Sequence, residues 1–161
     1  MSETLLYSRV ESPIGELLVV GDGHALHGLH MQEGRTAVPV DPEWRAADEP
    51  FADVREQLSQ YFAGERLHFD VPLAMAGTPF QRRVWDELQA IPYGETTTYG
   101  ELARRLGRAS ASRAVGLANG RNPIAVIVPC HRVIGSDGSL TGYGGGLERK
   151  SFLLELEARR T

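Results

Sequence analysis

Three short segments rich in apolar residues open the chain. They cover residues 4–10, 16–21 and 25–31, and Ser12-Pro13-Ile14-Gly15 and Asp22-Gly23, which are typical of turns, separate them. This pattern predicts an antiparallel meander of three strands. Residues 32–50 are polar and acidic and contain prolines, so we expect a loop there, whereas the alternation of apolar residues over 67–73 predicts another strand.

Between the expected loop and this strand, residues 51–62 show the helical spacing of apolar residues. The stripe consists of Phe51, Val54, Leu58 and Phe62. Gly64 is well placed to end this helix. Thr78-Pro79 predicts the start of another helix, because a hydroxyl side chain can cap it and proline suits the first helical position. Pro92-Tyr93-Gly94 should end that helix.

Two short helices are predicted next, one over about 99–106 closed by Gly107 and one from Ser110 or Ser112 to Asn119. Two short helices joined by a tight connection that contains glycine are a helix-turn-helix candidate. A last helix is expected over about 147–160, with Glu157 at the border of its apolar stripe. We therefore expect an α/β protein of the α+β type, with an N-terminal lobe over 1–77 and a C-terminal lobe over 78–161.

The second helix of this candidate pair is made mostly of small residues. They are Ala114, Gly116, Ala118 and Gly120, with Arg113 near the start. Such a helix can approach a partner closely, which suits the minor groove of DNA, about 6 Å wide. The alternative is that the small residues permit tight packing against another part of the protein.

Charge is distributed unevenly between the two lobes. Residues 1–79 carry 5 Arg against 13 Asp or Glu, and residues 80–161 carry 12 Lys or Arg against 8 Asp or Glu. The basic excess is concentrated in Arg104, Arg105, Arg108, Arg113, Arg121 and Arg132. This favours a basic face for a polyanion, and a solvated surface balanced by the acidic lobe is the alternative.

The composition indicates which cofactors and which cellular compartment are to be expected. One cysteine in 161 residues excludes an intramolecular disulfide and any site that needs several cysteines. The four histidines of the first lobe are scattered, so we predict no metal and no cofactor. The sequence has no apolar run of membrane-spanning length and no secretion signal, and we expect a cytoplasmic monomer without a membrane partner.

The lone cysteine lies in Val128-Pro129-Cys130-His131-Arg132-Val133. The apolar run 124–128 before it predicts a buried strand that ends at the thiol. A thiol of pKa about 8.5 needs a base or a positive charge to become nucleophilic. Because neighbours in a strand point to opposite faces, His131 could act on Cys130 only through a bridging water or a local turn. A buried structural cysteine is the alternative.

The motif and its flanks resemble the O6-alkylguanine-DNA alkyltransferases, also called methylated-DNA–protein-cysteine methyltransferases. The resemblance rests on Pro129-Cys130-His131-Arg132-Val133, Arg113-Ala114-Val115-Gly116, Gly120-Arg121-Asn122-Pro123 and Thr141-Gly142-Tyr143-Gly144-Gly145-Gly146. It is strongest from about Thr78 to the C-terminus. It implies a ribonuclease-H-like N-terminal lobe that mainly supports a winged-helix-like C-terminal lobe with a helix-turn-helix.

The resemblance also implies roles for the catalytic residues. Glu157 would orient and charge His131, which would act through water on Cys130. Tyr99 would donate a proton or hydrogen bond to N3 of the departing guanine, although packing at the start of a helix would explain it too. Asn122 would tie the turn after the second helix to the reactive segment, although Asn-Pro is also a common turn.

Further residues would contact DNA and the substrate base. Arg113 would fill the place of a flipped nucleotide, with an ordinary phosphate contact as its alternative, and the helix carrying Ala114 and Gly116 would enter the minor groove. The loop at Tyr143, Gly144 and Gly145 would close over the base, with backbone N–H groups directed at O6. The carbonyls of Cys130 and Val133 would accept from the exocyclic amine.

The expected activity is therefore DNA repair by direct and irreversible alkyl transfer. Duplex DNA containing O6-alkylguanine is the expected partner, O4-alkylthymine is a possible second substrate, and the alkylated cysteine would limit each molecule to one turnover. Two rivals remain. A lesion-binding protein of the alkyltransferase-like type would lack the acceptor cysteine, and a Cys-His hydrolase would turn over many times without needing Arg113.

Overall fold

The N-terminal lobe is built on a four-stranded sheet in the order β3-β2-β1-β4. The computed structural model describes residues 4–33, 37–138 and 146–160. β1 (Leu6–Val10), β2 (Leu17–Gly21) and β3 (Leu26–Met31) form an antiparallel meander. This confirms the three predicted strands. β4 (Arg45–Ala46), which runs parallel to β1, lies within the segment predicted to be a loop, so that prediction was incomplete.

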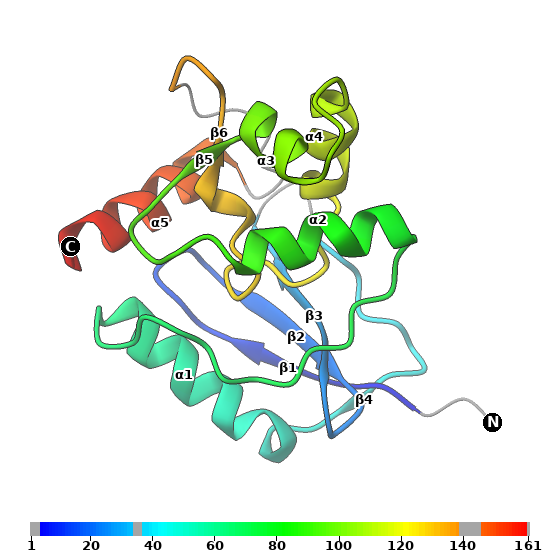
Figure 1. Ribbon diagram of the computed structural model, residues 1–161. Helices are drawn as coiled ribbons and strands as arrows, with labels where there is room; N and C mark the ends of the chain where they lie inside the picture. Colours follow the sequence, from blue (N-terminus) through cyan, green and yellow to red (C-terminus); the bar gives the residue numbers. More distant parts are fainter. Residues whose placement is uncertain (1–3, 34–36, 139–145, 161) are drawn as a thin grey trace.

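Both faces of this sheet are covered. Every residue of β2 is buried, including the neighbours Leu18 and Val19, whose side chains point to opposite faces. Helix α1 (Ala52–Phe62), preceded by the short 3₁₀ helix η1 (Glu49–Phe51), packs along one side of the sheet, and the C-terminal lobe lies across the other (Figure 1). One apolar core joins the two lobes.

Local chemistry sets the ends of the helices as expected. Gly64 follows α1 with a positive φ of 77°, a conformation that suits glycine. Thr78 caps α2 (Pro79–Gln89): its hydroxyl accepts from the backbone N–H of Gln81, and its own N–H donates to the Gln81 side chain. This reciprocal capping box, together with Pro79 at the first helical position, explains why the helix starts there.

The C-terminal lobe contains the predicted helix pair, α3 (Tyr99–Arg105) and α4 (Ser112–Gly120). The indole N–H of the buried Trp85 on α2 donates to the carbonyl of Ala118 at 2.9 Å, which fixes α4 against α2. A small parallel sheet joins β5 (Thr97–Thr98) to β6 (Val133–Ile134), and α5 (Leu147–Arg160) ends the lobe.

The apolar run before the cysteine is buried, but it is not a strand. Residues 124–128 form consecutive turns with one isolated bridge, between Leu29 and Ile124. Val126 has a positive φ of 70°, which is rare for a β-branched residue. The Asn122 side chain organises this segment, because its amide accepts from the N–H of Ile124 and donates to the carbonyl of Val128.

The second incorrect strand prediction concerns residues 67–73. Within this segment only Leu73 pairs with the sheet, in an isolated bridge to Leu26. The backbone instead runs from α1 towards α2 along the side of the molecule (Figure 1). Alternating apolar side chains here reflect partial burial against the core rather than a ladder of hydrogen bonds.

Cys130 itself begins a single 3₁₀ turn, η2 (Cys130–Arg132), instead of ending a strand. Helix α5 holds the segment after the thiol at two points seven residues apart on one helical face. Lys150 donates to the carbonyl of Val133 at 2.6 Å, and Glu157 binds His131 and Arg132. Two turns of one helix therefore fix the reactive segment.

Candidate functional site

A buried histidine–carboxylate pair lies beside the thiol. His131 Nε2 is 2.7 Å from Oε2 of Glu157, and the two side chains are 0% and 1% exposed. The structure thus brings together the pair that the resemblance implied. The 3₁₀ turn supplies the local turn that an interaction between His131 and Cys130 requires, and Nδ1 of His131 has no hydrogen-bond partner among the described residues.

The carboxylate of Glu157 is ionised despite its burial. Burial alone would raise its pKa, but the hydrogen bonds and charges of His131 and Arg132 lower it to about 2. Arg132 binds it in a bidentate manner, with Nε 2.8 Å from Oε1 and Nη2 2.9 Å from Oε2. Because an ionised carboxylate only accepts hydrogen bonds, the His131 Nε2 must carry the proton, which leaves Nδ1 as a free base.

The pKa of His131 is lowered, chiefly by burial, although Glu157 acts in the opposite direction. Its imidazole is therefore neutral near pH 7 and able to take a proton. Burial also raises the pKa of the Cys130 thiol, while a hydrogen bond with the Asn122 side chain and the charge of Lys150 oppose that rise. The resting thiol is protonated, so the reaction needs a base, and neutral His131 fits that need.

Two asparagines link α4 to the reactive segment. Asn122 holds the turns before Cys130, as described above, and also interacts with the thiol, while its hinge role stays a prediction. The buried Asn119 at the end of α4 points its amide nitrogen at the carbonyl of Cys130 from 3.4 Å. The inner side of α4 therefore touches the residue that carries the thiol.

The outer side of α4 is open. Arg113, Ala114 and Leu117 are exposed, and Leu117, at 64% exposure, follows Arg113 by one helical turn. A methyl group added at Gly116 would lie 3.7 Å from the Tyr99 ring, an ordinary contact, and one added at Gly120 would meet nothing within 4 Å. Packing within the protein does not require these two glycines, which contradicts the packing alternative for them and favours close approach by an external partner.

The predicted basic cluster is only partly available to a polyanion. Arg132 is buried in its pairing with Glu157 and must be removed from that set. Arg104 and Arg105 are exposed and lie near Glu101 on the same helix, and Arg108 lies over the Phe80 ring. Together with the exposed Arg113 and Arg121 they leave a basic surface around α3 and α4.

Other predicted residues have mixed outcomes. Tyr99 begins α3 and packs partly into the core beside Gly116, so the structure places it next to the second helix. Val133 is buried in β6, and its carbonyl accepts from Lys150. Tyr143, Gly144 and Gly145 lie outside the described residues.

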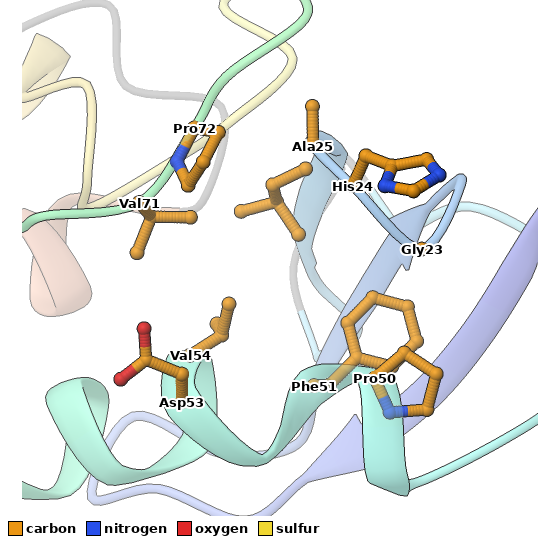
Figure 2. Close-up of a pocket in the computed structure, with 10 residues that line it drawn as sticks. Gly23, His24, Ala25, Pro50, Phe51, Asp53, Val54, Val71 and Pro72 are labelled. Atoms are coloured by element: carbon orange, nitrogen blue, oxygen red, sulfur yellow. The ribbon is translucent and has the colours of Figure 1, made fainter.

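A cavity of about 150 Å³ opens elsewhere in the N-terminal lobe (Figure 2). Figure 2 shows that its walls come from the β2–β3 turn, the start of α1 and residues 71–72. None of the candidate site residues lines it, and its ionisable groups are His24 and Asp53 alone. Within the described residues, no group of three or more His, Cys, Asp or Glu could hold a metal ion. The described helices include none long and apolar enough to cross a membrane.

Sequence reasoning missed four residues of this site: Tyr61, Asn119, Arg132 as a partner of Glu157, and Lys150. A signal existed for Lys150, because it lies three residues before Leu153 and seven before Glu157, on the buried side of α5. Tyr61 follows Leu58 by three residues, which predicts burial, but nothing local indicates a partner 96 residues away.

These features define a class of protein. It has two lobes and a helix pair of the helix-turn-helix type, and the second helix of the pair touches a buried cysteine that lies beside a histidine–glutamate pair. Two family models match the chain, the ribonuclease-like domain of 6-O-methylguanine DNA methyltransferase over residues 5–75 and its DNA binding domain over 79–159. The chain belongs to the 6-O-methylguanine DNA methyltransferase family. The predicted fold class, with its ribonuclease-like and DNA-binding lobes, is confirmed.

Individual relatives are similar to this protein in sequence and structure over nearly its whole length. A methylated-DNA–protein-cysteine methyltransferase of Methanosarcina acetivorans is 54% identical over 153 residues, which cover 95% of this chain and 98% of that protein. The crystal structure of the Mycobacterium tuberculosis O6-methylguanine methyltransferase superposes with a TM-score of 0.92 at 53% identity, over 98% of this chain and 95% of that one. A crystal structure of the M. tuberculosis protein in complex with DNA gives 0.91 at 52% identity, over 97% and 94% of the two chains.

Proposed function

We propose that this protein repairs DNA by transferring the methyl group, or a larger alkyl group, from O6 of guanine to Cys130. The observation that carries the proposal is the buried arrangement of Cys130 with His131 and Glu157 directly behind an open, small-residue helix. The activity named for the M. acetivorans relative supports it. O4-alkylthymine is the second substrate we propose.

The chemistry needs a thiolate, a leaving group and no cofactor. Neutral His131 accepts the thiol proton through a water, and the resulting imidazolium is stabilised by the ionised Glu157. The sulfur then attacks the alkyl carbon, so that a C–S bond forms while the C–O bond breaks and its electron pair stays with the guanine. Tyr99 assists by donating a hydrogen bond or proton to N3 of that guanine.

DNA binding brings the base to the thiol. The outer side of α4, with Ala114, Gly116 and Gly120, enters the minor groove because its small residues allow the backbone to come close. The target nucleotide must leave the stack, since O6 faces the major groove, and the exposed Arg113 fills its place.

The flipped base would be held by backbone groups. Val133 O keeps one lone pair after accepting from Lys150, so it can accept from the exocyclic amine of guanine together with Cys130 O. We propose that Tyr143, Gly144 and Gly145 close over the base from the loop that follows, with backbone N–H groups directed at O6. Asn122 keeps the turns that present the thiol in place.

Several properties complete the proposal. A thioether has no facile hydrolytic route back to a thiol, so each molecule acts once and the useful constant is a second-order rate of inactivation. We propose a cytoplasmic monomer. We place the boundary between the ribonuclease-like and acceptor lobes at residues 77 and 78, where the capping box starts α2.

Mass spectrometry tests the function directly. The protein is mixed with an excess of duplex that carries one O6-methylguanine, and both the intact mass and the peptide masses are measured. We expect a stoichiometric gain of one methylene mass on the peptide containing Cys130. An unmodified protein that still retards the damaged duplex would identify a lesion sensor, and repeated turnover of an ester would identify a hydrolase.

A further inference from the structure

Tyr61 brings the N-terminal lobe into the reaction centre. It lies on α1, is 0% exposed, and its hydroxyl is 2.5 Å from Oε2 of Glu157 on α5. Its pKa is raised far above the usual range, first by burial and then by the charge of Glu157. The phenol therefore remains protonated and acts as a hydrogen-bond donor to the carboxylate.

The Oε2 atom of Glu157 accepts from three groups. His131 Nε2, Tyr61 Oη and Arg132 Nη2 lie 2.7, 2.5 and 2.9 Å from it. A carboxylate oxygen has two lone pairs, so these donors compete for its electron density. Each donor therefore reduces the affinity of Glu157 for a proton and its pull on the proton of His131.

We propose that Tyr61 is a positioning residue of the alkyl transfer: its hydroxyl orients Glu157 and weakens the carboxylate enough to keep His131 an unprotonated base. The proposal rests on the proposed function of Cys130. It assigns to the ribonuclease-like lobe a direct part in the chemistry, in addition to its support of the other lobe.

Tyr61, Glu157 and His131 form a hydrogen-bonded relay. Other charged or titratable groups face this relay and must be held constant in a test. They are Cys130 and Arg132 from η2, Lys150 from α5, and Tyr93, whose ring lies 6.2 Å from that of Tyr61. Tyr61 differs from all of them because it comes from the N-terminal lobe. Its replacement by phenylalanine removes one hydroxyl and leaves each of those groups in place.

The test measures the second-order rate of methyl transfer from duplex O6-methylguanine as a function of pH. Without the Tyr61 hydroxyl, Glu157 is more basic and raises the pKa of His131, so the acid limb of the profile for Tyr61→Phe should move to higher pH. A shift of one pH unit corresponds to a reaction about tenfold slower on that limb. Tyr7→Phe, in β1 with its ring 6.4 Å from that of Trp44, is the matched control and should follow the wild-type profile.

Two further variants separate a chemical role from a structural one. In Glu157→Gln, the additional replacement Tyr61→Phe should cause no further shift of the acid limb. If Tyr61→Phe does not fold, 3-fluorotyrosine at position 61 keeps the ring and strengthens the donor, and the acid limb should then move to lower pH.

The outcomes distinguish this inference from the proposed function. A wild-type protein that never gains the methyl group contradicts the function itself. A wild-type protein that does so, with Tyr61→Phe and the fluorinated protein sharing its pH profile, overturns the role of Tyr61 alone.

Discussion

At the scale of single residues, the site combines a protonated thiol with a base that is kept neutral. Burial disfavours charge on Cys130, His131 and Glu157, but on Glu157 the contacts with His131 and with the bidentate Arg132 outweigh burial and lower the pKa. Arg132 therefore makes an ionised carboxylate tolerable in the core. The motif residue next to the histidine supports the relay and does not serve as a DNA contact.

The ionised Glu157 predicts a particular loss of stability in acid. Its pKa is about 2 in the folded protein against an ordinary 4.5, so only the unfolded chain binds its proton between these values. Stability from this group is present above pH 4.5 and falls as the pH drops towards 2, by about 3 kcal/mol at most. The pKa of His131 is also lowered from its ordinary 6.5, so this residue adds a further loss of stability as the pH falls below 6.5.

Urea unfolding at a series of pH values measures this effect. Glu157→Gln should be less stable than the wild type near pH 7, because Arg132 loses its charged partner, yet its stability should change less between pH 4.5 and 2. Parallel curves for the two proteins would show that another carboxylate controls the acid transition.

The thiol gives the second prediction at this scale. Cys130→Ala should abolish methyl transfer and leave binding of the damaged duplex largely intact, because Asn122 keeps its hydrogen bonds to Ile124 and Val128 and the outer side of α4 does not depend on the sulfur. Gel retardation and mass spectrometry measure the two properties separately. Residual transfer in this variant would place the nucleophile on another residue.

Sequence reasoning named some members of this buried cluster but not all of them, and their catalytic roles stay predictions. Cys130, His131 and Glu157 could be named because a specific motif and an acid bordering an apolar helical stripe marked them. Tyr61 could not, because its apolar spacing predicts burial without predicting a partner on α5. Arg132 was misplaced, because arginine near a DNA-binding helix pair reads as a surface charge.

At the scale of elements, α4 is shaped by two different requirements. Its inner side is fixed by Val115, Ala118 and Asn119, all buried, and its outer side is kept free of bulk. Glycine inside a helix lowers stability relative to alanine by about 0.5–1 kcal/mol. A glycine that packing does not require therefore costs stability, and under the proposed function DNA binding offsets this cost.

Gly116→Ala tests this interpretation. Its φ is not positive and the added methyl group makes only an ordinary contact with Tyr99, so the unfolding free energy should rise by about 0.5–1 kcal/mol. Repair of O6-methylguanine in a duplex should nevertheless become slower, whereas reaction with free O6-benzylguanine should not. Unchanged duplex repair would place the DNA backbone away from this position.

Arg113→Ala should separate duplex repair from the chemistry more strongly. The side chain is exposed and does not belong to the relay, so its loss should leave the reaction with free O6-benzylguanine nearly unchanged. The rate of repair in the duplex should fall much more than the rate with the free base. Unstacking the base costs a few kcal/mol, and no side chain would then fill the gap. Equal losses with both substrates would refute a flipping role.

Glycine, proline and hydroxyl residues at the helix ends made the helices predictable. The apolar run 124–128, by contrast, led to an incorrect prediction of a strand. Hydrophobicity reports burial, and a buried run of this length fits several backbone conformations. Here the Asn122 side chain satisfies backbone groups that a strand would pair with a neighbour. Val126 with its positive φ could not be anticipated from its residue type, which favours extended structure.

At the scale of the whole molecule, the unequal charge of the two halves orients the protein. The acidic excess lies in the first half of the sequence. In the second half, the exposed Arg104, Arg105, Arg108, Arg113 and Arg121 lie on α3, α4 and the turns that follow them, whereas Arg82 and Arg83 are exposed on α2 and Arg159 on α5. A polyanion is therefore attracted to the helix pair and repelled from the sheet side. This explains how a protein of net charge −4 can bind DNA.

The exposed arginines on α3, α4 and the following turns can neutralise only a few phosphates of the DNA. Since Arg132 is buried and Arg104 lies against Glu101, we expect a logarithmic salt slope of about 3 to 5, well below the value of about 10 of a large repressor. Titration of a fluorescent duplex at several salt concentrations measures it. A slope near 10 would require a much larger contact surface than α3 and α4 provide.

The helix that completes this cluster, α5, is made after the residues that it holds. During synthesis Tyr61 emerges first, Cys130 to Arg132 follow, and the carboxylate of Glu157 comes 27 residues after the thiol. Until Glu157 has been made, the chain holds Cys130 and His131 without the carboxylate that binds the imidazole in the folded protein. Under the proposed function, the complete arrangement of thiol, imidazole and carboxylate therefore exists only once α5 has docked against η2.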